Sequence, residues 1–193
     1  MRPRIVGMAF VIGLSFSATA QAGAVSGSML GNTCAGCHGV NGASAAETMP
    51  IIGGQSKTYI ESTMKQYRDG SRAATIMGRI AKGYNDEQIA AMSAFFAKQP
   101  WVSAPQPVDA KLAKQGEALY AKKCKMCHAE NGSKVPDGAP PRLAGQRTAY
   151  LRNFLDCVND AKCANNHPMK EQLFGKTAKA DIDALLQFFA SKN

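Results

Sequence analysis

The stretches Cys34-Ala-Gly-Cys37-His38 and Cys124-Lys-Met-Cys127-His128 lie ninety residues apart and share the pattern C-x-x-C-H. Each places two thiols close together and an imidazole directly after the second thiol. Two thiols at this spacing can add to the vinyl groups of a haem, whose iron the histidine can then ligate. One copy alone would also suit a zinc site or a redox-active dithiol. Two copies in one chain favour a covalently attached haem c at both.

The two motifs belong to an internal repeat. Landmarks downstream of the first motif recur in the same order after the second, at offsets that drift from 90 to 93 residues. This order indicates two duplicated units of about 85 residues, a size at which an apolar core alone is marginal. A haem in each unit would complete its core. The matched landmarks are His38 and His128, the stretches 50–55 and 141–146, Tyr59 and Tyr150, Met77 and Met169, and the pairs 95–96 and 188–189.

Hydrophobic periodicity predicts an all-α chain. Apolar residues recur at helical spacing in several segments, and no stretch alternates over six residues as a strand would. Asn85 and Gln88 fit a capping box, and Thr177 is a candidate cap for the last helix. The expected helical segments are 28–33, 57–67, one through 93–98, 112–123, 148–158 and 182–190.

The N-terminus has the pattern of a secretory signal peptide. Arg2 and Arg4 are basic, residues 5–20 are apolar, and Ala20-Gln21-Ala22 fits a cleavage site. The apolar stretch is short for a membrane span. We therefore expect residues 1–22 to be removed, with no membrane span left. Export to the periplasm would also suit attached haem and a disulfide.

Proline residues mark the join between the two units. Pro100, Pro105 and Pro107 predict an extended, stiff connector. We expect Trp101 in this connector to pack between the units rather than to contact a partner. The predicted organisation is an N-terminal haem c domain at 23–99, a linker at 100–110 and a C-terminal haem c domain at 111–193.

The positive charge of the chain gives little support to nucleic-acid binding. The formal charge is +9, and loss of Arg2 and Arg4 lowers it to +7. Four propionates from two haems would cancel much of the remainder. No run of lysine and arginine is interleaved with aromatic residues, so we expect no nucleic-acid partner.

The small number of histidines limits how the two irons can be ligated. His38 and His128 are the expected proximal ligands, and His167 is the only other histidine, so bis-histidine ligation at both haems is excluded within one chain. Methionines more often pack in cores, but the repeat pairs Met77 with Met169 and makes them the candidate sixth ligands. A six-coordinate iron has no open position for a substrate, which favours electron transfer over an enzyme such as a peroxidase.

Two prolines are candidates for supporting the proximal histidines. The carbonyl of Pro50 or Pro141 can accept the Nδ1–H of the histidine in its own unit, which would fix the tautomer and strengthen the ligand. The alternative is that each proline only stiffens its loop. The two roles are compatible.

Cys157 and Cys163 lie outside both haem motifs. A disulfide is the simpler interpretation, because an exported protein meets an oxidising compartment. The alternative adds His167, since two thiolates and an imidazole suit copper or zinc.

The repeated order of C-x-x-C-H, P-x-[IL]-x-G-Q-x-x-x-Y and a methionine resembles the dihaem cytochrome c4 group of class I cytochromes. The first half is more similar to the cytochrome subunit of flavocytochrome c sulfide dehydrogenase, in residues 32–39 and 74–84. The second half carries the more widely shared residues 143–146, Tyr150 and Pro168-Met169. The resemblance covers nearly all of the mature chain and implies two tandem class I cytochrome c domains. Cys157 and Cys163 depart from the family pattern.

The resemblance also implies a division of labour with a partner. In that family the cytochrome binds a separate flavoprotein that oxidises sulfide at an FAD, and two haems pass the electrons to a soluble acceptor. This chain would then be no enzyme by itself but the electron-transfer subunit of a heterodimer, with its first haem domain facing the flavin. It has no dinucleotide fingerprint, so the FAD would belong to the partner. The alternative is a free-standing cytochrome c4-type carrier that feeds a terminal oxidase.

We expect Cys157 and Cys163 to form a disulfide and to bind no metal. Five intervening residues allow the two Cα atoms to approach within bridging distance. The loop is short, so the bridge should stabilise the fold by about 2–3 kcal/mol. An intact mass two hydrogens below the dithiol value, measured after free metal is removed, checks this. Reduced thiols with stoichiometric copper or zinc would show instead that Cys157, Cys163 and His167 are metal ligands.

Overall fold

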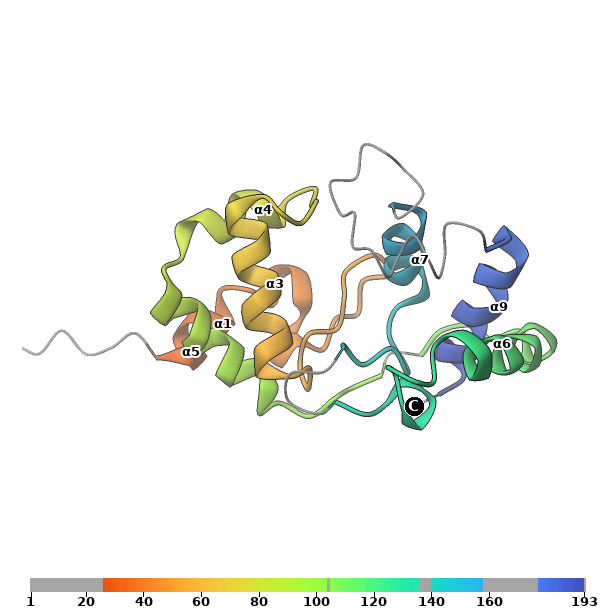
Figure 1. Ribbon diagram of the computed structural model, residues 1–193. Helices are drawn as coiled ribbons and strands as arrows, with labels where there is room; N and C mark the ends of the chain where they lie inside the picture. Colours follow the sequence, from red (N-terminus) through yellow and green to blue (C-terminus); the bar gives the residue numbers. More distant parts are fainter. Residues whose placement is uncertain (1–25, 104, 136–139, 158–176, 193) are drawn as a thin grey trace, which may run out of the picture.

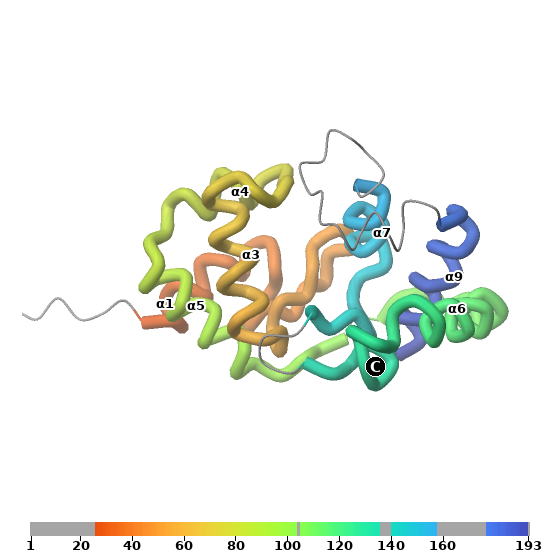
Figure 2. The backbone as a smooth tube through the Cα atoms, viewed as in Figure 1, coloured from red at the N-terminus to blue at the C-terminus, as the bar shows by residue number. Residues whose placement is uncertain are grey.

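The computed structural model describes residues 26–103, 105–135, 140–157 and 177–192, and in these ranges the chain is helical without a strand. The all-α prediction is confirmed. Figures 1 and 2 show two helical groups joined by an extended connector. The first unit holds α1 (Gly27–Asn32), α2 (Ala35–His38), α3 (Lys57–Asp69), α4 (Met77–Ile80) and α5 (Asp86–Ala97). The second holds α6 (Ala110–Lys123), α7 (Thr148–Asp156) and α9 (Lys179–Ala190).

Side-chain caps fix where most of the longer helices begin. The predicted capping box is confirmed, because Gln88 N donates to Asn85 Oδ1 at 2.9 Å and Asn85 N donates to Gln88 Oε1 at 3.0 Å. The predicted Thr177 cap is wrong. Ala178 takes the extended cap conformation and no side chain caps α9, while Thr177 Oγ1 accepts from Lys123 Nζ at 2.9 Å.

The first and last helices of each unit cross in close contact. Helix α1 lies on α5, and α6 lies on α9. The contact requires glycine, because a β-carbon on Gly27 would overlap the carbonyl oxygen of Ala91, and one on Gly116 would overlap that of Ala184. In both units the next side chain that the β-carbon would meet is the matched phenylalanine, Phe95 or Phe188, so the duplication seen in the sequence is also a duplication of packing.

Each unit has its own apolar core beside these crossings. The predicted aromatic pair supplies a fully buried ring to each core, Phe96 at 2% exposure and Phe188 at 1%. The ring of Phe188 stacks on Tyr120 with 4.8 Å between centroids. The first core contains Leu30, Ile60, Met64, Ala81, Ile89, Met92 and Phe96. The second contains Tyr120, Cys124, Leu151, Leu155, Ile182, Leu185, Leu186, Phe188 and Phe189.

The loop after each C-x-x-C-H motif turns back through an asparagine–glycine pair. Asn41 and Asn131 have φ values of 56° and 59°, and each is followed by a glycine with positive φ. The carbonyl of Gly42 accepts from Ile52 N at 3.0 Å, and that of Gly132 accepts from Leu143 N at 2.9 Å. Both bonds fold the chain after the turn back toward the motif.

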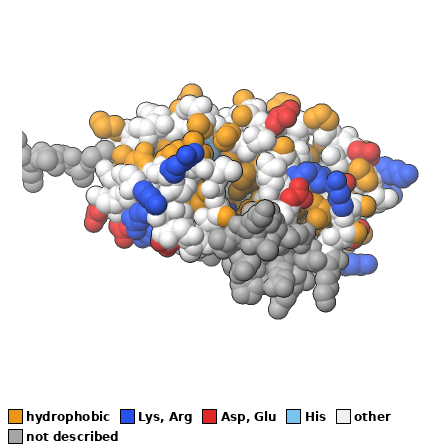
Figure 3. Space-filling view, turned by 90° about the horizontal axis from the view of Figure 1, so that it is seen from above, with side chains coloured by type: hydrophobic (Ala, Val, Ile, Leu, Met, Phe, Trp, Pro, Cys, Tyr) orange, Lys and Arg blue, Asp and Glu red, His pale blue; other side chains and the backbone are white. Residues whose placement is uncertain are grey.

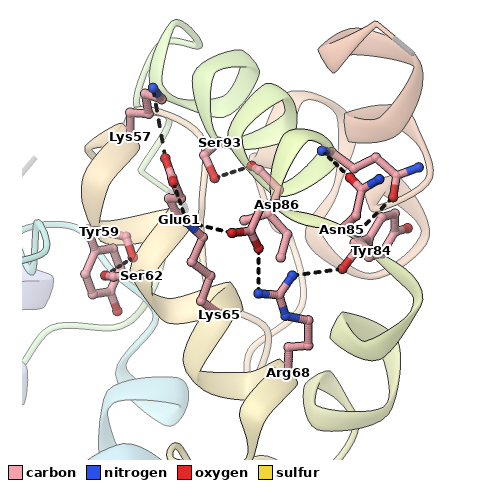
Figure 4. Close-up of polar contacts among 12 residues, drawn as sticks. Lys57, Tyr59, Glu61, Ser62, Lys65, Arg68, Tyr84, Asn85, Asp86 and Ser93 are labelled. Atoms are coloured by element: carbon pink, nitrogen blue, oxygen red, sulfur yellow. Dashed lines mark hydrogen bonds and ion pairs between the residues drawn. The ribbon is translucent and has the colours of Figure 1, made fainter. Parts of the chain in front are cut away.

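A chain of ion pairs fastens α3 to the start of α5 (Figure 4). Arg68 Nη2 lies 2.6 Å from Asp86 Oδ1, and Lys65 Nζ lies 2.8 Å from Glu61 Oε1. Arg68 Nη1 also donates to the carbonyl of Tyr84 at 3.2 Å. Arg68 and Lys65 lower the pKa of Asp86. Exposed pairs of this kind stabilise little, but this group ties α3 to the segment that follows Met77.

We expect Gly116→Ala to destabilise the second unit. Alanine gains about 1 kcal/mol of helix propensity over glycine, but its β-carbon must push α6 away from the backbone of Ala184, a net loss of about 1–3 kcal/mol. Denaturant unfolding of the haem-loaded protein measures this. Gly83→Ala is the matched control, because nothing lies within 4 Å of its β-carbon position. A Gly116→Ala protein with unchanged stability would contradict the tight crossing.

Candidate haem sites

Helix α2 and the preceding turn place the first motif at the edge of an apolar interior. His38 is the last residue of α2, and its N–H donates to the carbonyl of Cys34 at 3.0 Å. The His38 side chain is buried at 8% exposure, Cys34 is half-buried and Cys37 is exposed. One thiol thus faces inward and the other outward, with the imidazole beside them.

The second motif repeats this arrangement at the end of α6. Cys124 ends that helix and is buried, Cys127 is exposed, and the N–H of His128 donates to the carbonyl of Cys124 at 2.8 Å. Both motifs therefore present two thiols and an imidazole in the same way.

Each motif histidine forms a hydrogen bond with a prolyl carbonyl, as predicted. His38 Nδ1 lies 3.0 Å from Pro50 O, and His128 Nδ1 lies 3.0 Å from Pro141 O. A carbonyl can only accept, so the proton of the neutral ring is on Nδ1 and Nε2 keeps its lone pair. Burial lowers the pKa of both imidazoles, and the prolyl bond offsets part of this effect. The neutral form that metal ligation requires is therefore favoured.

A cavity of about 980 Å³, its open mouth included, lies beside His38. Cys34, His38 and Met77 all line it, and Met77 begins helix α4. Hydrophobic side chains form most of its wall and gather around the hollow on the face shown in Figure 3. An inward thiol, an imidazole with a free Nε2 and a thioether in one apolar cavity fit a covalently held haem.

The thiols do not have the properties of a redox dithiol. Burial raises the pKa of Cys124 to about 11 and also raises the pKa of Cys34. A reactive C-x-x-C pair has a lowered pKa instead. Within the described ranges, no three His, Cys, Asp or Glu side chains gather as a metal site would require. The zinc and dithiol interpretations of the two motifs therefore have no support there.

The second unit completes the wall of the first site. Tyr150, Leu151 and Phe154 of α7 line the same cavity as His38. The guanidinium of Arg72 lies 5.4 Å from the ring centre of Tyr67 and 5.5 Å from that of Phe154, so it packs on rings from both units. No sequence pattern singled out Arg72, because its contacts join residues far apart in the chain.

The connector also packs between the units. The guanidinium of Arg142 lies 4.8 Å from the ring centre of Trp101, and a β-carbon on Gly54 would lie 2.9 Å from the backbone nitrogen of Trp101. The prediction that Trp101 packs between the units is confirmed. Arg147, which the sequence also did not single out, is buried and donates through Nη2 to the carbonyl of Ser44 at 2.7 Å.

Several predicted site residues lie outside the described residues. These are Met169, Cys163 and His167. Cys157 ends α7 and is disulfide-bonded, but its pairing with Cys163 stays a prediction. Every helix in the described part of the chain is too short or too polar to cross a membrane.

Comparison with known proteins places both units in one family. The family model for cytochrome c matches residues 24–99 and 113–191. Cytochrome c4 of Pseudomonas aeruginosa is 27% identical over 97% of this chain and 98% of its own length. The cytochrome subunit of sulfide dehydrogenase from Chlorobaculum tepidum is 44% identical over 70 residues, which cover 36% of this chain and 63% of that protein.

A solved structure agrees with the arrangement of the two units. Reduced recombinant cytochrome c4 from Pseudomonas stutzeri superposes with a TM-score of 0.77 at 26% identity, over 86% of this chain and 97% of that one. Two tandem helical domains, each with its own C-x-x-C-H motif, imply two covalently bound haems that carry electrons. The chain belongs to the cytochrome c family, as a cytochrome c4-like dihaem class I cytochrome.

Proposed function

We propose that this chain accepts electrons from a separate FAD-containing sulfide dehydrogenase and passes them to a soluble acceptor. The observation that carries this proposal is the 44% identity of a 70-residue segment to the cytochrome subunit of a sulfide dehydrogenase. The chain by itself is then no enzyme. Its signal peptide directs it to the periplasm, and the FAD is bound only by the partner.

The proposed haem ligands follow from the two motifs. Cys34 and Cys37 hold the first haem, and Cys124 and Cys127 hold the second. His38 and Met77 are the axial ligands in the first unit, and His128 and Met169 in the second. The haem iron supplies a one-electron redox change. The wall of the cavity is mostly apolar, and the prolyl carbonyls orient the histidines.

An exposed apolar edge supports a partner at the first site. Ile76 and Ile80 flank Met77 and are 43% and 39% exposed, and Ile80 also lines the cavity. Apolar side chains with this exposure beside a redox cavity suit a docking surface, where a partner excludes water from the path of the electron. We place the flavoprotein contact here.

A free-standing carrier that feeds a terminal oxidase is the second candidate. The observation in its favour is the full-length match to cytochrome c4, over 97% of this chain and 98% of the relative. The two candidates share the proposed haem ligands and differ in whether a flavoprotein binds near Ile76 and Ile80.

Both haems should be low-spin with histidine and methionine ligands. We expect Met77→Ala and Met169→Ala each to remove about half of the methionine-to-iron absorption near the red edge of the oxidised spectrum, because each thioether serves one of two irons. Met126→Ala is the matched control, since Met126 is 92% exposed, and it should leave the band intact. If neither Met77→Ala nor Met169→Ala changes the band, the ligand assignment is wrong.

The chain should bind a sulfide-oxidising flavoprotein through its first unit. We expect Ile76→Glu and Ile80→Glu to weaken that binding by about tenfold or more, because a carboxylate cannot be buried in an apolar contact without a partner. Calorimetry with the purified flavoprotein measures the affinity. Val108→Glu is the control, an exposed apolar residue near the start of α6.

Two outcomes would contradict this assignment. Sulfide oxidation by the purified chain without a flavoprotein would contradict the division of labour. A chain that stays monomeric in the presence of its native flavoprotein would favour the free-standing carrier.

A further inference from the structure

One peptide group joins His38 to the opposite unit. The carbonyl of the Pro50–Ile51 peptide accepts from His38 Nδ1 at 3.0 Å, and the N–H of the same peptide donates to Gln146 Oε1 at 2.9 Å. Gln146 belongs to the second unit. A single peptide group therefore links His38 of the first unit to the side chain of Gln146 in the second unit.

The second unit has the reciprocal arrangement. The carbonyl of the Pro141–Arg142 peptide accepts from His128 Nδ1 at 3.0 Å, and its N–H donates to Gln55 Oε1 at 2.9 Å. Gln55 and Gln146 are equivalent positions of the repeat, 91 residues apart. Each unit therefore provides one glutamine to the prolyl peptide of the other unit, as in a contact across a twofold axis.

The orientation of both glutamine side chains is set by a second bond. Gln146 Nε2 donates to the carbonyl of Ile51 at 2.9 Å, and Gln55 Nε2 donates to the carbonyl of Arg142 at 3.1 Å. Because the nitrogen of each amide must face a carbonyl, its oxygen faces the peptide N–H. Gln55 and Gln146 are 3% and 2% exposed, so water does not compete for these bonds.

The physical effect follows from the polarity of the amide. When a peptide N–H donates to a strong acceptor, its carbonyl oxygen becomes a better acceptor, and buried bonds of this kind reinforce one another. A better acceptor at Nδ1 makes the imidazole a stronger donor through Nε2. The ligand strength of each histidine then depends on a glutamine in the other unit.

We propose that Gln146 tunes His38 and that Gln55 tunes His128, so that each haem potential is set in part by the opposite unit. The proposal rests on the proposed role of both histidines as iron ligands. Gln55 and Gln146 are positioning residues, because they act through a peptide group and touch no ligand atom. Docking of the two units and the strength of both histidine ligands are thereby coupled.

The test replaces each glutamine in the full-length haem-loaded protein by methionine, which has a similar shape and no amide. With ¹⁵N-labelled histidine in the ferrous state, Gln146→Met should move the Nδ1–H resonance of His38 upfield and leave that of His128 in place. Gln55→Met should do the reverse. Gln106→Met is the matched control, since Gln106 bonds to the backbone of Gln146 and Thr148 and to neither prolyl peptide.

The haem potentials should change in the same crossed pattern. A histidine that donates more weakly to iron favours the ferrous state. Each variant should therefore raise the ferrous-to-ferric ratio of the haem in the opposite unit by about two- to fivefold at a fixed solution potential. For one electron, at about 59 mV per tenfold, this is a rise of about 20–40 mV. Unchanged resonances and potentials, or equal shifts at both haems in both variants, would overturn the proposal.

The outcome also separates this inference from the proposed ligation. If oxidation leaves the signals of His38 and His128 unshifted, these residues do not bind iron and both proposals fail. If oxidation shifts them and the crossed pattern is absent, only the role of the glutamines fails. Should a variant fail to fold, the wild-type protein decides through the scalar coupling across the hydrogen bond between the N–H of Ile51 and the side-chain carbonyl of Gln146. Absence of that coupling overturns the proposal.

Discussion

The hydrogen bond from each motif histidine to a prolyl carbonyl is the constraint on which the rest of the structure depends. It fixes the proton on Nδ1 and leaves Nε2 available, which is what iron requires of a neutral imidazole. The bond requires the loop after each motif to turn back, and the turns at Asn41 and Asn131 make it do so. The same two prolyl peptides then receive Gln146 and Gln55 from the opposite unit, so the histidine environment and the interface between the units are one hydrogen-bonded system.

The duplication is close in the backbone and incomplete in the side chains. Turns, prolyl bonds, terminal helix crossings and glutamines recur in both units. Arg72, Arg147 and the Trp101–Arg142 stack have no matching contact among the described residues. Because α7 of the second unit lines the cavity beside His38, the first site has an environment that no isolated unit would give it.

The sequence predicted what is local and left open what depends on how the units dock. Short sequence patterns predicted the haem motifs, the prolyl partners of His38 and His128, the Asn85 cap and the all-α fold. The interacting residues in each of these patterns lie close together in the sequence. The prediction of Thr177 as the cap was wrong because α9 begins at Lys179, so its N-cap position falls on Ala178, one residue after Thr177. Gln55 and Gln146 were visible only as landmarks of the repeat, since their partners lie 87 and 95 residues away. The exposure of Ile76 and Ile80, on which the proposed docking surface rests, could not be predicted, because periodicity in such a short helix does not show which side chains are exposed.

We infer that each unit binds one haem covalently through its own C-x-x-C-H motif, and the other properties of both sites depend on this attachment. Its most direct test is the intact mass of the exported chain under denaturing conditions, for the wild type and for variants that replace both motif cysteines of one unit by alanine. We expect two retained haems in the wild type and one in the Cys34→Ala/Cys37→Ala variant and in the Cys124→Ala/Cys127→Ala variant. A wild-type chain that loses either haem on denaturation, or a variant that still retains two, would contradict it.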